Sequence, residues 1–370
     1  MLKRSTILAF LTLCMACATL KAEDLDVAPV VREGTAWYDA ANWDVEGQCW
    51  KDVERHFARC PARAKGVIPE GVWANSQHSA GLITRFRTDS TSISVKYKLY
   101  SPNLAITLMP ATGVSGLDLY VLHNGKWCWV ACTKPDAQEA TQILVSGMTN
   151  EMKEYMLYYP LYNGIDQLEI GVPEEAHFFA MAPRKEKPVF YYGTSITNGG
   201  CVSRPGNAFT AMLGRRLDLP VINFGFAGSA RMEPELAKLI IEMDPAIFVL
   251  DALPNMSPQE TATRPIPFIQ ILRDAHPETP ILLVEDRSFS NSYLLPDVAA
   301  THKARREGLK KAYEHFIALG DKNIYYLSAE NLLGEQLDYD STMDASHPND
   351  LGMYRMTDSL EKVLRPILKK

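Results

Sequence analysis

The stretch of sequence that most constrains the fold is Val189-Phe-Tyr-Tyr192 followed by Gly193-Thr-Ser195-Ile-Thr-Asn-Gly-Gly200. A short apolar run that ends in glycine and hydroxyl residues is typical of a buried strand leading into a tight turn. Downstream of this stretch, further apolar runs alternate with segments of helical periodicity. That alternation predicts a parallel sheet covered by helices on both faces, with functional residues beyond the carboxyl ends of its strands.

The second half of the chain supplies the elements of this sheet. We expect strands over residues 189–192, 221–223, 246–250, 281–284 and 323–327. We expect helices over residues 208–217, 234–243, 267–275, 298–319 and 352–368. No phosphate-binding glycine loop follows these strands, and Thr197 stands where a Gly-x-Ser-x-Gly elbow needs glycine, which argues against the α/β-hydrolase fold.

The first half has the two-residue periodicity of half-buried strands. The segment Ser92-Ile-Ser-Val-Lys-Tyr-Lys-Leu-Tyr100 alternates strictly, and Asn124-Gly125 is a strong hairpin signal. Short strands at this spacing predict an all-β sandwich resembling a jelly roll, and the polar, proline-flanked segment 182–188 predicts a linker. We therefore expect a signal peptide over 1–22, a β-sandwich domain over 23–180, a linker over 181–188 and an α/β domain over 189–370.

Composition excludes several classes of protein. The chain has 370 residues, a net charge of −6, 46% hydrophobic and 22% charged residues, values that exclude wholesale disorder. Because no basic surplus exists, a nucleic-acid partner held through its phosphates is not expected.

The N-terminus resembles an export signal. Lys3 and Arg4 precede the apolar run Ile7 to Ala18, which is too short to cross a bilayer comfortably. Cleavage near residue 22 removes Lys3, Arg4 and Lys21 and lowers the net charge of −6 by three, to −9. A lipoprotein with a modified Cys17 is the alternative. We expect a periplasmic, secreted or lipid-anchored protein with no transmembrane helix.

Five cysteines remain after the predicted signal. Cys49 and Cys60, and Cys128 and Cys132, are the pairs closest in sequence, but sequence alone assigns no disulfide. No histidine pair has the spacing of a zinc site, so no metal is expected. We expect Cys201 to be a free, buried thiol.

Reactive residue types follow the predicted strands of the second half. They are Ser195, the glycines of the loop that contains Gly228, Asn255, and the pair Asp344 and His347. A serine hydroxyl needs a base, which His347 can supply while Asp344 orients the imidazole. The backbone N–H groups of Ser195 and Gly228 and the Asn255 amide can form an oxyanion hole. Together these groups predict acyl transfer.

The ordered blocks Gly-Thr-Ser-Ile-Thr, Asn-Phe-Gly-Phe-Ala-Gly, Leu-Pro-Asn and Asp-Ala-Ser-His resemble those of the SGNH/GDSL hydrolases. The resemblance implies a flavodoxin-like three-layer α/β/α domain with these same catalytic roles. Two departures are Thr194, where the family has aspartate, and a third block that reads Leu253-Pro254-Asn255-Met256. Gly116-Leu-Asp-Leu-Tyr120 resembles the Gly-x-Asp-Leu-Tyr motif of a bacterial subfamily with an added β-domain, which includes esterases that remove O-acetyl groups from glycans.

Other residues have two interpretations each. Arg204 can touch a substrate oxygen or form a structural salt bridge. Asp251 can accept a hydrogen bond near the oxyanion hole or be a strand-end turn residue. Asp118 and Tyr120 are expected to give structural support, either at the contact between the domains or to a loop over the site. The tryptophans of the first half can belong to the core or stack on sugars.

These patterns together predict an exported serine esterase without metal or organic cofactor. Its expected substrate is an acylated small molecule or glycan. The family resemblance and the export signal imply a short acyl group, with acetate on a sugar hydroxyl as the leading choice. The alternatives are a lipid or aryl esterase or a thioesterase that uses the same triad, and, in another class, a non-catalytic glycan-binding protein. The sequence predicts no oligomeric state.

Overall fold

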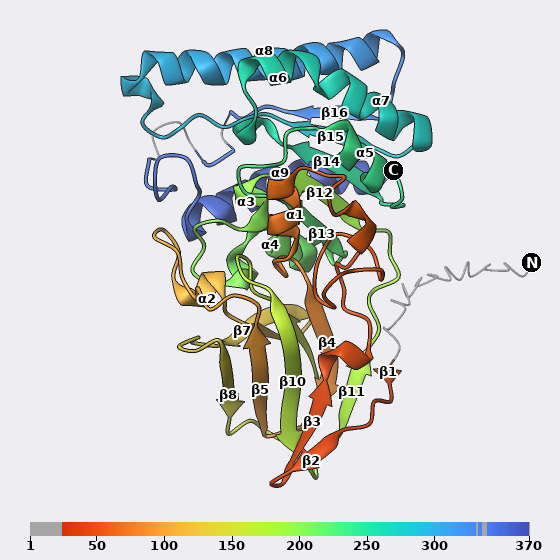
Figure 1. The fold of residues 1–370 in the computed structure, drawn as a ribbon, viewed down its shortest axis with the longest axis vertical. Coiled ribbons are helices and arrows are strands. Elements are labelled where there is room, and N and C mark those ends of the chain that lie inside the picture. The colour runs from red at the N-terminus through yellow and green to blue at the C-terminus, as the bar shows by residue number, and fades with distance from the viewer. Residues whose placement is uncertain (1–23, 331, 335–338, 370) are drawn as a thin grey trace, which may run out of the picture.

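The computed structural model describes residues 24–330, 332–334 and 339–369, so the predicted signal peptide lies outside the described residues. A β-sandwich and an α/β unit are stacked along the long axis of the molecule (Figure 1). In the described ranges no helix is long and apolar enough to cross a membrane.

The sandwich consists of two antiparallel sheets. The first has the order β1 (Asp24–Leu25), β11 (Phe178–Met181), β4 (Ile83–Thr88), β9 (Lys153–Tyr158), β6 (Asp118–His123) and β7 (Lys126–Cys132). The second has the order β2 (Val30–Arg32), β3 (Thr35–Asp39), β10 (Ile165–Pro173), β5 (Ser92–Leu99) and β8 (Glu139–Ser146). The sheets bury the alternate side chains of β5, and Asn124-Gly125 turns the β6–β7 hairpin with positive φ at both residues, as predicted.

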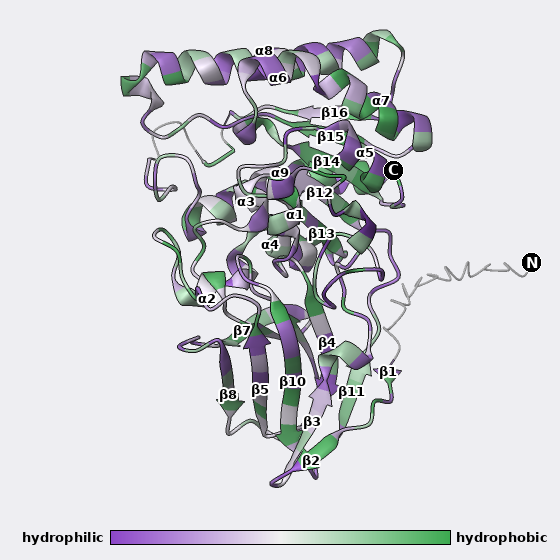
Figure 2. Ribbon diagram, viewed as in Figure 1, coloured by the Kyte–Doolittle hydropathy of each residue, from purple (hydrophilic) through white to green (hydrophobic). Residues whose placement is uncertain are grey.

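The α/β unit contains a five-stranded parallel sheet. Its order is β13 (Val221–Gly225), β12 (Val189–Gly193), β14 (Ile247–Asp251), β15 (Ile281–Val284) and β16 (Ile324–Leu327). Every residue of the first four of these strands is buried, because helices cover both faces. Figure 2 shows the resulting contrast between apolar β14 and the alternating colours of β10.

The helices divide between the two faces of this sheet. One face packs against α1 (Glu70–Ser76), α5 (Pro234–Ile240), α7 (Pro265–Ala275) and α8 (Pro296–Ala318). The other packs against α4 (Phe209–Leu217) and α9 (Asp350–Leu368). This is the predicted flavodoxin-like three-layer arrangement. The sequence analysis missed α6 (Pro258–Thr263), a short helix begun by a capping box from Ser257 and Glu260, and α2 (Ala111–Val114).

Part of the first half of the chain packs on the core of the parallel sheet. Trp50, Cys60 and Val72 are buried in the same cluster as Phe190 and Phe224 of the parallel sheet. Part of the predicted sandwich domain 23–180 therefore packs as a layer of the α/β unit. The segment has neither strand alternation nor a long helical stripe, so no periodicity in the sequence indicated where it packs.

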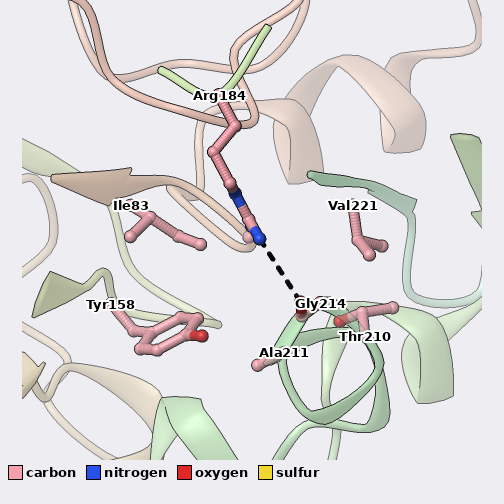
Figure 3. A pocket seen from close by; sticks show the side chains of 8 residues that line it. Ile83, Tyr158, Arg184, Thr210, Ala211, Gly214 and Val221 are labelled. Carbon is pink, nitrogen blue, oxygen red and sulfur yellow. Dashed lines mark hydrogen bonds between the residues drawn. The ribbon is translucent and has the colours of Figure 1, made fainter. Parts of the chain in front are cut away.

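The predicted linker is fixed in place. Arg184 donates to the buried Glu46 carboxylate (2.6 Å from Nη2) and, at 3.5 Å, to the Gly214 carbonyl. Figure 3 shows Arg184 beside a cavity of about 10 Å³ between the sandwich and α4, at the lower limit for one water molecule. Burial alone raises the pKa of Glu46, but the charge and hydrogen bonds of Arg184 outweigh it, and the pKa is lowered.

All cysteines in the described residues are free thiols. Cys201 is free as expected, but it is only partly buried, because its left-handed backbone (φ 69°) places it in the turn after the Ser195 helix.

Candidate active site

The turn after β12 positions Ser195. Gly193 pairs in register with Gly225 of β13 and Asp251 of β14, so the three strands end together. The Thr194 hydroxyl caps the short helix α3 (Ser195–Asn198) by accepting the Ile196 N–H at 3.3 Å. This capping role explains why threonine can replace the aspartate of the family pattern. A Cβ at Gly193 would lie 2.0 Å from the Thr197 hydroxyl, so only glycine fits there.

Ser195, His347 and Asp344 form a connected hydrogen-bond series. Ser195 Oγ lies 2.8 Å from His347 Nε2, and His347 Nδ1 lies 2.8 Å from Asp344 Oδ2. Asp344 Oδ1 also accepts the backbone N–H groups of His347 (2.7 Å) and Ser346 (3.0 Å). With Nδ1 protonated against the carboxylate, Nε2 is free to accept the serine proton.

The Asp344 carboxyl is held in its ionised form. Its partial burial raises the pKa, but hydrogen bonds from the His347 backbone and ring, together with the His347 charge, outweigh burial and lower it. An ionised carboxylate beside Nδ1 stabilises the imidazolium that forms when His347 takes a proton.

The loop that carries His347 is anchored to the loop after β15. Ser290 N–H donates to the Ala345 carbonyl (2.9 Å), and Arg287 Nη2 donates to the Ser346 carbonyl (3.2 Å). Ala345 has a positive φ of 68°, an uncommon conformation for a residue with a Cβ. Hydrogen bonds from the loop after β15 therefore hold the His347 loop in this conformation.

The proposed oxyanion donors lie at the same edge of the sheet. Gly228 has φ 66°, and a Cβ placed there would meet no atom within 4 Å, so the glycine faces open space. No protein acceptor for the backbone N–H of Ser195 or Gly228 is found among the described residues. The Asn255 amide donates to the carbonyls of Phe226 (3.1 Å) and Ala230 (3.3 Å), and so spans the loop that contains Gly228.

The structure places Arg204 in the contact between the domains. Its Nη1 donates to Asp118 Oδ2 (2.8 Å) and the Tyr120 hydroxyl (2.5 Å), and its guanidinium lies 4.9 Å from the Trp129 ring centroid. Asp118 is fully buried and also accepts the Gly206 N–H. Arg204 therefore forms a structural salt bridge with Asp118, one of its two expected roles. Asp118 and Tyr120 give structural support at the contact between the domains. A substrate contact by Arg204 stays a prediction.

Residues of the first half hold the loops that carry Ser195 and Gly228, and the sequence analysis missed them. Arg59 is 3% exposed and donates to the carbonyls of Gly225 (2.8 Å) and Asn223 (3.2 Å) at the start of the Gly228 loop. It also donates to the Asn75 carbonyl (2.7 Å). The Tyr162 hydroxyl donates to the Ser195 carbonyl (2.9 Å).

The missed contacts leave little trace in the sequence, because each joins a side chain to a backbone carbonyl far away in the chain. Burial lowers the pKa of Arg59 to about 10, so it stays cationic at neutral pH.

Asp251 lies at the end of β14 and is fully buried. Its Oδ2 accepts the Tyr191 hydroxyl (3.1 Å), whereas Oδ1 has no partner. Burial raises the pKa of Asp251 to about 7, although the nearby charge of Arg287 opposes the rise. In the described ranges, no group of three histidine, cysteine, aspartate or glutamate side chains is arranged to hold a metal ion.

Comparison with known proteins finds matches to both halves of the chain. Residues 186–365 match the GDSL-like lipase/acylhydrolase family, and residues 35–178 match the N-terminus of SGNH-hydrolase-type esterases. A crystal structure from Bacteroides ovatus ATCC 8483, named as a GDSL-like lipase, is 31% identical with a TM-score of 0.86. The alignment covers 90% of this chain and 98% of that one.

More distant structures share the fold. A salicylyl-acyltransferase from a tetracycline biosynthetic pathway is 20% identical over 93% of this chain and 97% of its own, with a TM-score of 0.70. An acetyl xylan esterase from the rumen bacterium Butyrivibrio proteoclasticus is 12% identical over 90% of this chain and 99% of its own, with a TM-score of 0.56. No curated protein sequence matches the chain.

Proposed function

Because the chain belongs to the SGNH/GDSL hydrolase family and is an ester hydrolase of that type, we propose that it removes short acyl groups, acetyl above all, from carbohydrate hydroxyls. The observation that supports the mechanism is the pair of hydrogen bonds that joins Ser195 Oγ to His347 Nε2 and His347 Nδ1 to Asp344 Oδ2, each with a donor–acceptor distance of 2.8 Å. The carbohydrate substrate is supported by the acetyl xylan esterase that shares this two-domain fold.

In the proposed first step, Ser195 Oγ attacks the ester carbonyl while His347 Nε2 takes the hydroxyl proton. The carbonyl oxygen becomes anionic and accepts hydrogen bonds from the backbone N–H groups of Ser195 and Gly228. The intermediate collapses, His347 returns the proton to the leaving sugar oxygen, and the acyl group remains on Ser195. Water, activated by His347, then attacks the acyl-enzyme and releases the carboxylic acid.

The Asn255 amide is proposed as the third oxyanion donor. Its two hydrogen bonds, to the carbonyls of Phe226 (3.1 Å) and Ala230 (3.3 Å), hold it against the loop that contains Gly228, and an oxyanion would take the place of one of these carbonyls. Removal of one such donor typically slows an acyl-transfer reaction by about 10²–10³-fold.

A single substitution tests the mechanism. Ser195→Ala should abolish hydrolysis of p-nitrophenyl acetate and labelling by a fluorophosphonate, while the circular dichroism spectrum stays unchanged. A variant that folds normally and keeps wild-type turnover would refute the assignment of Ser195 as nucleophile.

Two alternatives make different predictions. A lipid esterase would prefer p-nitrophenyl esters of long acyl chains over acetate, and a thioesterase would prefer acyl thioesters. A non-catalytic glycan-binding protein would turn over none of these esters.

Export is proposed from residues 1–22 alone. A mature protein that begins near residue 23 in the periplasm or medium would support the signal peptide, and a lipid-modified Cys17 would support the lipoprotein alternative.

A further inference from the structure

A cleft borders the loop that carries His347. It has a volume of about 530 Å³, far more than an acetyl group needs. Its walls come from the loops after β15 and β16, the start of the short turn at 292–294, and residues 339–342. Ser290 joins the cleft to the catalytic loop, because its N–H donates to the Ala345 carbonyl and its hydroxyl lies 3.1 Å from the Thr342 hydroxyl.

The topology of the sheet sets the distance between this cleft and the nucleophile. Ser195 follows β12, and the order β12-β14-β15-β16 places the cleft loops two and three strands away. At about 4.8 Å per strand, the separation along the edge is roughly 10–14 Å. A short acyl group bound to Ser195 cannot span this distance, so an acetyl ester can reach the cleft only with its alcohol part.

Two exposed tyrosines form an aromatic platform at the cleft. Tyr293 is 70% exposed and Tyr339 is 45% exposed, and their ring centroids lie 5.4 Å apart. Aromatic rings left in solvent at the wall of a cleft offer an apolar face for a ligand that is itself partly polar.

The polar lining favours a neutral ligand. Hydroxyl side chains line much of the cleft, namely Ser288, Ser290, Ser292, Ser328, Ser341 and Thr342, beside the apolar Phe289, Leu332 and Leu333. Four charged side chains line the cleft, Glu285, Arg287, Arg306 and Glu330, and their formal charges cancel. Arg287 is buried and donates from Nη2 to the Ser346 carbonyl (3.2 Å), while its Nε and Nη1 have no partner among the described residues. Glu285 accepts the Tyr326 hydroxyl (2.5 Å) and the Ala329 N–H (2.8 Å), and Arg306 donates to the Asp286 carbonyl (2.6 Å). A chain of hydroxyl-bearing rings matches this lining better than an anion or an acyl chain.

We infer that this cleft binds the glycosyl units adjoining the acylated sugar, with Tyr293 and Tyr339 stacking on them. The inference rests on the proposed function and extends it, because it assigns a polymeric or oligomeric carbohydrate as the alcohol part of the ester. Tyr293 and Tyr339 are binding residues in this assignment and take no part in the chemical step.

The experiment compares a small ester with a polymer. Wild type, Tyr293→Ala and Tyr339→Ala are assayed on p-nitrophenyl acetate and on acetylated xylan, with released acetate as the readout. Loss of one stacking ring should lower kcat/KM on acetylated xylan by about three- to tenfold, mainly through KM, and leave p-nitrophenyl acetate kinetics unchanged. Tyr293→Phe keeps the ring and should retain wild-type kinetics on both substrates.

A matched control and the contrary outcomes separate the two proposals. Tyr354→Ala removes a tyrosine of α9 that is 54% exposed and outside the cleft lining, and it should change neither substrate. Turnover of acetylated xylan that both cleft variants leave intact would overturn the cleft assignment and leave the esterase proposal standing. A wild-type protein that cleaves neither substrate would overturn the proposed function. Cleavage of p-nitrophenyl acetate without acetylated xylan, or a cleft-variant defect confined to long acyl esters, would overturn the glycan assignment.

Discussion

The two ends of the carboxyl edge of the parallel sheet are built differently. Beyond β12 and β13, Arg59 binds the carbonyls that lead into the Gly228 loop, and the Asn75 side chain donates to Ala227 of that loop. Beyond β15 and β16, the cleft is open and its tyrosines are exposed. The packed end contains Ser195 and the Gly228 loop, where displacements below 1 Å matter, and the open end borders the His347 loop and has room for ligands of variable length.

This difference suggests a role for the sandwich domain. Its polypeptide supplies Arg59, Asn75 and Tyr162, which fix the loops around Ser195. It supplies no residue to the cleft beyond β15 and β16, as far as the described lining shows. The comparison therefore predicts that changes at Arg59, Asn75 or Tyr162 affect kcat on every ester, whereas changes at the cleft tyrosines affect only large substrates.

The largest effect is expected where the two ends meet, at the carboxylate that orients His347. Asp344→Asn keeps the shape of the side chain but removes the charge that fixes the His347 tautomer. Such a change at a Ser-His-Asp site lowers kcat by about 10⁴-fold. Turnover of p-nitrophenyl acetate by this variant should fall on that scale with KM nearly unchanged, and a loss below tenfold would exclude Asp344 from the triad.

Two buried carboxyls along the edge should respond oppositely to pH. The pKa of Asp251 is raised to about 7 from 3.8, so the native state binds its proton more tightly than the unfolded state. Stability linked to Asp251 is complete below about pH 4 and is lost as pH rises toward 7. Asp251→Asn should therefore gain stability relative to wild type over this range, by up to about 4 kcal/mol in urea unfolding.

Asp286 provides the opposing control. Burial raises the pKa of Asp286, but its hydrogen bond with His302 (2.6 Å) and the neighbouring positive charges outweigh burial and lower it. Stability linked to Asp286 is present above its unfolded pKa and is lost as pH falls through the native value. Asp286→Asn should thus be most destabilising near neutral pH. Parallel pH profiles of wild type and Asp251→Asn would contradict the assignment of a raised pKa to Asp251.

A smaller effect is expected from the support of the Gly228 loop. Arg59→Met keeps much of the side-chain volume but leaves the carbonyls of Gly225 and Asn223 without their donor. A displaced oxyanion loop should lower kcat by about 10²-fold on p-nitrophenyl acetate and on acetylated xylan alike. Arg63→Met, at an exposed arginine paired with Asp52 and Glu242, is the matched control and should keep wild-type kcat.

A second substitution tests whether Arg59 positions the Gly228 loop through its hydrogen bonds or only stabilises the fold. Arg59→Lys should recover part of kcat, because the ammonium can still donate to one of the carbonyls. A variant that loses thermal stability but keeps kcat would show that Arg59 is structural and does not position the loop.

Much of the fold and part of the candidate site could be predicted from local sequence. The helix at 209–217 begins and ends within one residue of its predicted bounds, because its apolar stripe is local. The parallel strands were predictable because burial on both faces requires continuous apolar runs. The order of the reactive residues was enough to predict that Ser195, Asp344 and His347 act together, since Ser195 follows a recognisable strand and the other two lie in one short loop.

Tertiary structure alone decided which distant groups meet. The amino-acid order determined the sheet, the turn at Ser195 and the three-residue spacing of Asp344 and His347, because these depend on neighbours in the chain. Three features could not be predicted from it: the packing of segment 49–73 on the second core, the pairing of Arg204 with Asp118, and the hydrogen bonds of Arg59 to the carbonyls of Asn75, His78, Asn223 and Gly225. Each of these depends on partners that are brought together only when the two cores fold against each other. Because every residue has a backbone carbonyl, no residue type in the sequence marks which carbonyl will accept a distant side chain.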